Sequence, residues 1–367
     1  MSLMAEVIIT GQDSQTLASL GEFGLITALS SWLPPGRRTL VGIGDDAAVL
    51  AVPDGRVVAT TDFLLEGRHF RRDWSGAADV GHKAAARSLA DLAAMGAEAS
   101  ALLVALAAPA DLPVSWAREL AEGLAAECAR AGASVIGGDT ARAEQVVLAV
   151  TGLGDLAGRA PVLRSGAAPG DQVAVAGPLG HAAAGLALLT AALSDDDLVA
   201  RDDLVVAHLR PAPPYDAGPE AADLGATAMI DISDGLLADL GHVAAASGVR
   251  VDLAADALRP GDRLLTAARA VLDAAGNASS GRTGPGSRPD PAGPPPSAEA
   301  PQVQALTLKQ ALGWVLTGGE DHSLAATFPP GTRLPPRWRV IGAVRPGHGV
   351  VVDGQPWAGA PGWDHFA

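Results

Sequence analysis

Apolar positions along the first half of the chain follow two different periods. The stretches 56–61, 133–136 and 145–152 are short and rich in β-branched residues, which is typical of strands. The stretches 80–95 and 114–130 are Ala-rich with apolar residues at helical spacing, so they predict amphipathic helices. Because strands alternate with helices, this half of the chain is predicted to have an α/β fold.

The same alternation continues in the second half. Strands are predicted at 172–176 and 227–230, and a helix at about 181–192 is followed by further helices up to Leu224. Another helix is predicted to begin near Gly235. The second half is therefore also expected to be α/β.

The length of 367 residues suits two domains better than one hydrophobic core. A turn-rich stretch, 158–170, separates the halves, so we predict an N-terminal domain over 1–157 and a C-terminal domain over 158–367. The stretch 276–301 is full of Gly, Pro and Ser and cannot bury enough surface to offset its ordering entropy. It is predicted to be a disordered loop inserted into the second domain.

Composition narrows the class of protein. The chain is 48% hydrophobic, as expected of a globular protein, and its longest apolar stretch, 102–110, is too short to span a bilayer. The N-terminus carries no basic segment followed by an apolar run, so no secretion signal is predicted. Cys128 is the only cysteine, which excludes an internal disulfide and a multi-cysteine zinc site. We expect Cys128 to be a small apolar residue of a helix in a cytoplasmic protein.

The net charge of −15 excludes nucleic acid as a natural partner, because nucleic acid requires a basic surface. Part of this charge is explained by solubility alone, so the positions of the acids carry more information than their number. Acids recur beside glycine or hydroxyl residues. These groups are Gly44-Asp45-Asp46, Thr60-Thr61-Asp62, Asp91, Gly138-Asp139-Thr140, Asp231-Ile232-Ser233-Asp234 and Gly318-Gly319-Glu320-Asp321.

Several of these groups directly follow a predicted strand, and the carboxyl ends of strands in α/β sheets face the ligand crevice. A single aspartate in such a place commonly closes a turn or caps a helix, and Asp234 before Gly235 fits that alternative. Asp91 also fits a solvated helix face, although its neighbours Leu89 and Leu92 are apolar. Clustered carboxylates repel one another unless cations neutralise them, which favours Mg²⁺ held together with substrate phosphates.

The sequence contains neither a G-x-x-x-x-G-K-[ST] phosphate loop nor the protein-kinase motif set. Lys83 and Lys309 are its only lysines, and neither follows a glycine-rich loop. A phosphate site must therefore use metals, backbone amides and arginine. The stretch 137–140 offers amides beside a metal ligand, and the forked side chain of Arg164 matches phosphate geometry. A surface arginine in a turn is the alternative for Arg164.

The motifs taken together resemble those of the thiamine-monophosphate kinase family. In the first half they are Gly21-Glu22-Phe23, Gly42-Ile43-Gly44-Asp45-Asp46-Ala47-Ala48, Thr60-Thr61-Asp62, Glu66-Gly67, His69-Phe70, Asp91-Leu92-Ala93-Ala94-Met95-Gly96-Ala97 and Gly137-Gly138-Asp139-Thr140 with Arg142. In the second half they are Arg164-Ser165-Gly166, Pro169-Gly170-Asp171, Arg210-Pro211, Ile230-Asp231-Ile232-Ser233-Asp234-Gly235-Leu236, Gly318-Gly319-Glu320-Asp321 and Trp363-Asp364-His365-Phe366. The likeness covers nearly the whole chain outside 276–301.

The resemblance implies the two-domain mixed α/β fold shared with aminoimidazole ribonucleotide synthetase and selenophosphate synthetase, usually dimeric through the N-terminal sheets. It implies phosphorylation of thiamine monophosphate by ATP to thiamine diphosphate, the last step in making that cofactor. It implies Mg²⁺ ligands at Asp46, Thr60, Thr61, Asp62, Asp91, Asp139, Asp231 and Asp234. It also implies ATP contacts at Gly138, Asp139, Arg164 and Ser233, and contacts to the thiamine phosphate at His69, Glu320 and Trp363.

The chain departs from the family pattern at four places near these motifs. They are Ser88, Ala90, His322 and Ser323, where the family usually has Asn, Ser, Tyr and Glu. None is a proposed metal ligand, so the departures concern the details of the substrate pocket.

The implied chemistry needs no catalytic side chain. A phosphate monoester has a second pKa near 6, so the acceptor is already a dianionic nucleophile at neutral pH. The obstacle is repulsion between the two phosphates, about 4 kcal/mol for unit charges ~4 Å apart at an effective dielectric of ~20. Several Mg²⁺ ions would cancel that repulsion, and we expect direct in-line transfer without a phosphoenzyme.

Two proposed substrate contacts have simpler alternatives. An aromatic face attracts a cation such as thiazolium by roughly 0.5–2 kcal/mol, which suits Trp363, but a tryptophan near the C-terminus can also serve burial alone. His69 is equally compatible with a structural histidine.

Two rival functions are consistent with the fold. One is another enzyme of the same fold, making an aminoimidazole ribonucleotide, a selenophosphate or a hydrogenase-maturation product; selenophosphate synthesis would require a reactive cysteine near the N-terminus, whereas Cys128 lies inside a predicted helix. The other is a non-catalytic nucleotide- or metal-binding module. Its acid set would be degenerate, whereas every proposed metal ligand is present.

Overall fold

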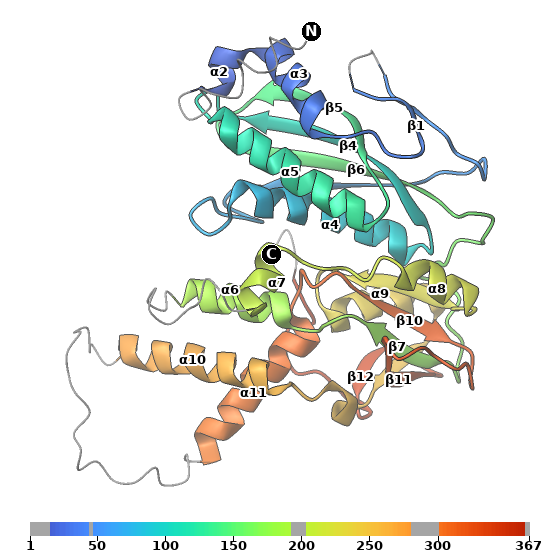
Figure 1. The fold of residues 1–367 in the computed structure, drawn as a ribbon. Helices are drawn as coiled ribbons and strands as arrows, with labels where there is room; N and C mark the ends of the chain where they lie inside the picture. The colour runs from blue at the N-terminus through green and yellow to red at the C-terminus, as the bar shows by residue number, and fades with distance from the viewer. Residues whose placement is uncertain (1–14, 44–46, 192–202, 280–300, 364–367) are drawn as a thin grey trace.

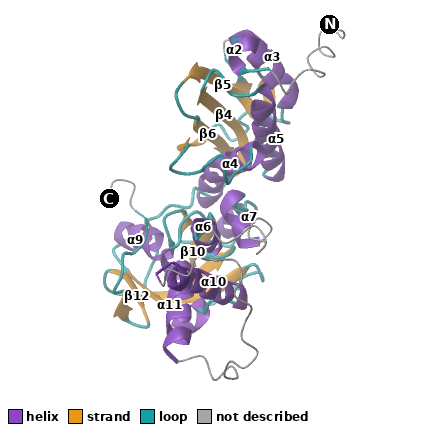
Figure 2. Ribbon diagram, turned by 90° about the vertical axis from the view of Figure 1, so that its left-hand side faces the viewer, coloured by secondary structure: helices purple, strands orange, loops and turns teal. Residues whose placement is uncertain are grey.

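The computed structural model describes residues 15–43, 47–191, 203–279 and 301–363, and its two halves lie one above the other (Figure 1). A view turned by 90° shows the same two halves (Figure 2). Both views place helix α4 (Ala77–Ala94) where the halves meet. This position makes α4 the element that connects the two cores.

The N-terminal half is built on one sheet and two long helices. Among the described residues, this sheet has four strands in the order β3-β6-β4-β5, with β6 antiparallel to β3 and β4, and β5 parallel to β4. The elements are α2 (Leu17–Leu20), α3 (Glu22–Trp32), β1 (Thr39–Val41), β2 (Val49–Leu50), β3 (Val58–Leu65), α4, β4 (Glu98–Ala108), α5 (Val114–Arg130), β5 (Val135–Arg142) and β6 (Val147–Asp155).

Helices α4 and α5 cover one face of this sheet, and their apolar faces join the leucines of the strands in one core. The two helices approach closely at a pair of glycines. A side chain at Gly81 would meet the carbonyl oxygen of Leu120 at 2.2 Å, and one at Gly123 would meet that of Ala78 at 2.2 Å. Only glycine allows the backbones to come this close.

The C-terminal half is built on a larger mixed sheet. Within the described residues it has seven strands in the order β13-β12-β9-β11-β7-β10-β8. The elements are β7 (Gln172–Ala176), α6 (His181–Thr190), α7 (Asp203–Leu209), α8 (Ala217–Asp223), β8 (Ala228–Ile232), α9 (Leu236–Ser247), β9 (Arg250–Leu253), the 3₁₀ helix η4 (Ala255–Leu258), α10 (Asp262–Ser279), α11 (Pro301–Thr317), β10 (Ser323–Phe328), β11 (Trp338–Arg345), β12 (Gly349–Val352) and β13 (Gln355–Pro356).

Small residues form the apolar contact between the halves. Ala93 and Ala94 at the end of α4 pack in one buried cluster with Ala217 of α8 and with alanines of β7 and β10. A side chain at Gly218 would meet the carbonyl oxygen of Ala93 at 2.0 Å. The close approach brings the end of α4 onto the strands that carry the C-terminal acids.

A buried carboxylate also ties the halves together. Glu127 of α5 is fully buried and accepts hydrogen bonds from the Tyr215 hydroxyl at 2.5 Å and from Arg130 at 2.7 Å. Its other oxygen lies 3.0 Å from Nδ1 of His82 on α4. Tyr215 precedes α8, so this cluster joins both helices of the N-terminal half to the C-terminal half.

Most elements predicted from the sequence are confirmed. The helix at 114–130 and the strand at 172–176 are found as predicted, and the helix at 80–95 becomes α4 with an earlier start. Cys128 is buried on α5, and burial raises the pKa of its thiol to about 12, as suits an apolar role. No helix in the described ranges is long and apolar enough to cross a membrane.

Two parts of the prediction differ from the structure. The stretch 102–110 was recognised only as an apolar run, whereas most of it belongs to the central strand β4. The predicted loop 276–301 was too long, because α10 continues to Ser279 and α11 begins at Pro301. The remainder of that loop, 280–300, lies outside the described residues. The predicted boundary at 157 stays a prediction, and it falls between β6 and β7.

Candidate functional site

Two acids of the N-terminal half face each other between β3 and α4. The Thr60 hydroxyl donates a hydrogen bond to Oδ2 of Asp91 at 2.6 Å. The Ser88 hydroxyl donates to Oδ2 of Asp62 at 2.8 Å and lies one helical turn before Asp91. Alternation along β3 places Thr60 and Asp62 on the face that meets α4, so strand and helix together orient both carboxylates.

A third acid approaches from the C-terminal half. Asp231 lies at the end of β8, is buried, and has its Oδ2 3.2 Å from Nδ1 of His322. Burial, together with the negative charges of Asp231 and Asp62, raises the pKa of Asp91 to about 7. The close approach of like charges raises the free energy of this arrangement unless a cation is bound.

The described residues do not contain a complete metal cage. No three His, Cys, Asp or Glu side chains among them lie close enough together to hold a metal ion by themselves. The predicted ligand Asp46 lies outside the described residues. Mg²⁺ is commonly held by one or two carboxylates plus substrate phosphates, so mutually repelling acids with space between them fit that mode.

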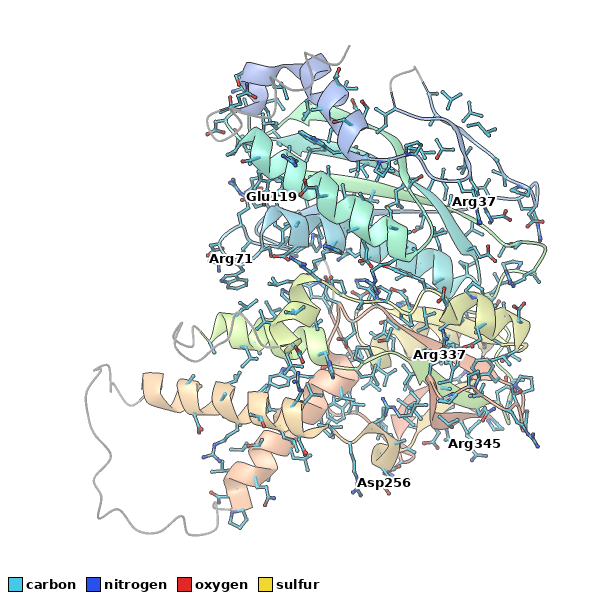
Figure 3. All side chains as sticks on the ribbon, in the orientation of Figure 1. Arg37, Arg71, Glu119, Asp256, Arg337 and Arg345 are labelled. Atoms are coloured by element: carbon cyan, nitrogen blue, oxygen red, sulfur yellow. The ribbon has the colours of Figure 1, made fainter. Side chains whose placement is uncertain are left out.

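A pocket of about 330 Å³ is lined by residues of both halves of the chain, and Arg87 links Glu320 on its wall to Asp62. All of the predicted contacts to the thiamine phosphate, His69, Glu320 and Trp363, line it, together with Ser233 and Asp234. Trp363 is 59% exposed, and the guanidinium carbon of Arg68 lies 5.9 Å from its ring centroid. Arg71, which also lines this pocket, lies on the side of the N-terminal half that faces α6 (Figure 3).

Glu320 sits between two cations of α4. Its Oε2 lies 3.0 Å from Nζ of Lys83, and its Oε1 lies 2.6 Å from Nη1 of Arg87. Burial would raise the pKa of Glu320, but the two cations outweigh burial and hold that pKa well below its ordinary value. Glu320 has a φ of 69°, a left-handed conformation that is uncommon outside glycine, so the surrounding structure imposes its orientation.

The neighbouring Asp321 anchors this loop. It accepts hydrogen bonds from the backbone N–H groups of Gly180 at 2.5 Å and Ala182 at 2.8 Å, at the start of α6. The alternative that Asp234 caps the next helix does not match the structure. The N-cap residue of α9 is Gly235, without a side-chain cap, and Asp239 in the helix accepts from the N–H groups of Asp234 and Gly235 at 3.0 Å each. The side chain of Asp234 is thus not required as a cap.

Other predicted site residues lie apart from this group of acids. Thr61 alternates onto the opposite face of the sheet, where the Thr151 hydroxyl donates to it at 3.1 Å. Asp139 is exposed on β5, the sheet edge opposite β3, and accepts from the N–H of Thr140 at 2.8 Å. Gly138 precedes it, where a side chain would collide with the carbonyl of Val104 at 1.8 Å.

The side chain of Arg164 also makes no hydrogen bond or ion pair with the described acids of the site. It is exposed in a loop that Ser247 at the end of α9 holds in place. The Ser247 hydroxyl accepts from the N–H groups of Gly166 and Ala167 at 3.1 and 3.2 Å and lies 3.1 Å from the carbonyl of Arg164. The loop is therefore fixed, and Arg164 extends from it toward solvent.

Sequence reasoning missed four residues of this region. Lys83 was set aside because it follows no glycine-rich loop, and Arg87 was not singled out at all. Both lie one or two turns before Asp91 on the buried face of α4. Ser88 and His322 were noted only as departures from a pattern, yet each contacts a predicted metal ligand. For Lys83 and Arg87, the available signal was a charged residue within an apolar helical stretch, because buried charges are rarely without a partner.

The pocket also contains a buried histidine whose titration is measurable. Burial, and then the charge of Lys83, lowers the pKa of His208 to about 3. The unfolded chain takes up this proton near pH 6.5, whereas the folded chain resists it until about pH 3. Stability contributed by neutral His208 is therefore complete above pH 6.5 and is lost as the pH falls toward 3.

We expect His208 to steepen the acid side of the stability curve by up to about 1.4 kcal/mol per pH unit. Urea unfolding of the parent and of His208→Gln between pH 7 and 5 would measure the difference in slope. The exposed His348 provides a matched control, His348→Gln, which should leave the slope unchanged. Identical slopes for the parent and His208→Gln would contradict this expectation.

Comparison with known proteins matches both halves of the chain to one family. Residues 44–156 match the N-terminal domain of AIR synthase related proteins and residues 168–283 match their C-terminal domain. The thiamine-monophosphate kinase of Mycobacterium tuberculosis is 44% identical over 96% of this chain and 94% of its own length. That of Escherichia coli K12 is 36% identical over 84% of this chain and 83% of its own length.

Solved structures agree. The crystal structure of thiamine-monophosphate kinase from Stenotrophomonas maltophilia K279a superimposes with a TM-score of 0.70 at 31% identity, covering 91% of this chain and 97% of that one. AaThiL complexed with AMPPCP and TMP superimposes with a TM-score of 0.68 at 31% identity, covering 96% of this chain and 99% of that one. The hydrogenase maturation protein HypE, at 16% identity and a TM-score of 0.58, shares the fold alone. This chain belongs to the thiamine-monophosphate kinase family of AIR synthase related proteins.

Proposed function

We propose that this protein transfers the γ-phosphate of ATP to the phosphate of thiamine monophosphate, giving thiamine diphosphate and ADP. The observation that carries the proposal is that acids of both halves, Asp62, Asp91 and Asp231, interact where the halves meet. Arg87 links Asp62 to Glu320, which lines one pocket with His69 and Trp363. The match with thiamine-monophosphate kinases along 96% of the chain supports the same substrates.

Each end of thiamine monophosphate has a suitable partner in the pocket. The exposed face of Trp363 can stack on the cationic thiazolium, and Glu320 supplies a counter-charge. The backbone N–H of Leu65 donates a hydrogen bond to Nδ1 of His69 at 3.0 Å. In the neutral imidazole the proton is therefore on Nε2, which can donate to the substrate. We assign that donor to the acceptor phosphate, while Trp363 and Glu320 hold the thiazolium.

Transfer itself requires no general base. An oxygen of the acceptor phosphate attacks the γ-phosphorus, the bond to the bridging oxygen of ADP breaks, and ADP leaves with that electron pair. Mg²⁺, when bound, would supply the positive charge that offsets repulsion between the phosphates. Of the residues implied by the resemblance, those that would hold it are Thr60, Asp62, Asp91, Asp231 and Asp234. Thr61 and Asp139 lie on the other face and at the opposite edge of the sheet, and Asp46 lies outside the described residues. Gly138, Arg164 and Ser233 remain proposed ATP contacts.

The test is direct. Purified protein incubated with Mg-ATP and thiamine monophosphate should form thiamine diphosphate and ADP one for one. Thiamine and aminoimidazole precursors serve as parallel substrates, because relatives of this fold act on other acceptors. ATP consumption with one of those substrates, without product from thiamine monophosphate, would contradict the proposed substrate and support the fold alone. Binding of ATP without turnover of any acceptor would favour the non-catalytic alternative.

We further propose a cytoplasmic homodimer formed through the N-terminal sheet. The face of that sheet opposite α4 and α5 carries Thr61 and Phe63 of β3, opposite Thr151 and Ala149 of β6. Phe63 is 59% exposed. Exposed apolar residues on a sheet face are typical of an interface between subunits.

Phe63→Glu is expected to convert the dimer to a monomer, because the interface would then bury a charge without a partner. Light scattering after size exclusion measures the mass of the parent and the variant. Leu306→Glu is the matched control, since Leu306 of α11 is 53% exposed but lies on the C-terminal half. A dimer that persists in Phe63→Glu would place the interface elsewhere.

A further inference from the structure

Arg87 occupies the middle of the contact between the two halves. Arg87 is only 9% exposed. Its Nη1 lies 2.6 Å from Oε1 of Glu320, and its Nη2 lies 3.9 Å from Oδ1 of Asp62. One end of the guanidinium thus faces a proposed metal ligand and the other faces the substrate pocket. An acceptor phosphate must lie between these two places during transfer.

Unsatisfied polar atoms are concentrated at the same point. Among the described residues, five buried side-chain nitrogen or oxygen atoms lack a hydrogen-bond partner, and three of them are Arg87 Nε, Glu320 Oε2 and His322 Nε2. Lys83 Nζ lies 3.0 Å from Glu320 Oε2 and supplies its counter-charge, so the atoms here without any polar partner are Arg87 Nε and His322 Nε2. Buried polar groups normally have partners, so this concentration indicates that ligand atoms complete the site.

We propose that thiamine monophosphate binds by exchanging ion-pair partners with this cluster. The step rests on the proposed function, because the substrate carries both a phosphate and a thiazolium cation. The phosphate takes the Arg87 guanidinium and the Lys83 ammonium, and the thiazolium takes the Glu320 carboxylate that these cations release. Before binding, the Glu320 carboxylate occupies the position of the substrate phosphate beside the two cations, and the cations occupy the position of the thiazolium beside Glu320.

Partner exchange also gives a reason for preferring the phosphorylated substrate. Thiamine has the cation but no phosphate, so it can draw Glu320 away only by leaving Arg87 and Lys83 buried without a counter-charge. Uncompensated buried charge is costly, and this cost selects against the unphosphorylated compound. A guanidinium also grips phosphate through two parallel N–H groups, which would fix the nucleophile beside Asp62.

The experiment measures binding of thiamine monophosphate and of thiamine by calorimetry, without ATP, to the full chain and to Arg87→Met. Methionine keeps most of the volume and removes the charge. Affinity for thiamine monophosphate should fall about 10- to 100-fold, the loss expected when a hydrogen bond to a charged group is removed. Affinity for thiamine should rise rather than fall, because one of the two cations that Glu320 would leave without a counter-charge is gone. Arg87→Lys should show a smaller loss of affinity for thiamine monophosphate than Arg87→Met.

Equal losses for both compounds would mean that Arg87 only supports the shape of the pocket, and an unchanged affinity for thiamine monophosphate would also overturn the proposal. Arg118→Met is the matched control, because Arg118 pairs with Glu122 on the exposed side of α5. It should change neither affinity.

A second variant covers the case in which Arg87→Met does not fold. In Glu320→Gln, both cations lose their counter-charge, so inorganic phosphate should bind more tightly than to the parent. Equal or weaker phosphate binding would overturn the proposal. If the parent does not turn over thiamine monophosphate, the proposed function fails. If the parent is active but Arg87→Met keeps the full preference for the phosphorylated compound, only the partner exchange fails.

Discussion

Asp62→Asn is expected to lower kcat for thiamine diphosphate formation by about 1,000-fold or more, because one negative charge disappears where positive charge must be concentrated. The Ser88 hydroxyl donates to Oδ2 of Asp62, and an asparagine oxygen can accept the same bond. Asparagine also has nearly the same volume. The substitution therefore removes charge while keeping the packing between β3 and α4.

A single-turnover assay at saturating Mg-ATP would separate transfer from product release. Thermal unfolding should show a midpoint close to that of the parent, since loss of charge also relieves the repulsion that Asp62 exerts on Asp91. Asp256→Asn is the control for a neutralised acid, because Asp256 lies at the far end of the C-terminal half (Figure 3). Activity of Asp62→Asn within about 10-fold of the parent would remove Asp62 from the proposed metal ligands.

Glu127→Ala should lower the free energy of unfolding by about 3 kcal/mol or more, the loss measured when one partner of a buried ion pair is removed. Burial would raise the pKa of Glu127, but hydrogen bonds from His82, Tyr215 and Arg130 outweigh burial and hold that pKa below its ordinary value. Alanine would leave the buried Tyr215 hydroxyl without its acceptor. The contact between the two halves would weaken with it.

Urea unfolding followed by intrinsic fluorescence would measure this loss at neutral pH. Glu122→Ala provides the comparison on the same helix, because Glu122 is half exposed and pairs with Arg118 one turn away. An exposed pair of this kind contributes less than about 1 kcal/mol. Similar losses in the two variants would show that the buried cluster does not join the halves.

The sequence identified the α/β alternation because apolar spacing records which side of an element is buried. Helix α5 and strand β7 were located from that pattern alone. Strand β4 was not located from the pattern. It lies between β5 and β6, so it has apolar residues on both faces and shows little alternation. The last turn of α10, which falls at the start of the 276–301 stretch, was hidden by the composition of that stretch.

For the candidate site, the sequence supplied the acids and their order, since a carboxylate beside a glycine at a strand end can be recognised locally. The family resemblance also pointed to His69, Glu320 and Trp363, which line one pocket in the structure. Spacing could not show that Thr61 points to the other face of the sheet. Nor could it show that Asp139 lies at the opposite edge of the sheet from β3.

The sequence by itself determined the fold class, the family and the residue types of the site, because each depends on local pattern or on motif order. Only the tertiary structure decided which charges meet. Asp91 and Asp231 are 140 positions apart in the numbering, and Arg87 and Glu320 are separated by 233. Packing of α4 onto the C-terminal sheet brings them together, and burial there makes their charges interact strongly.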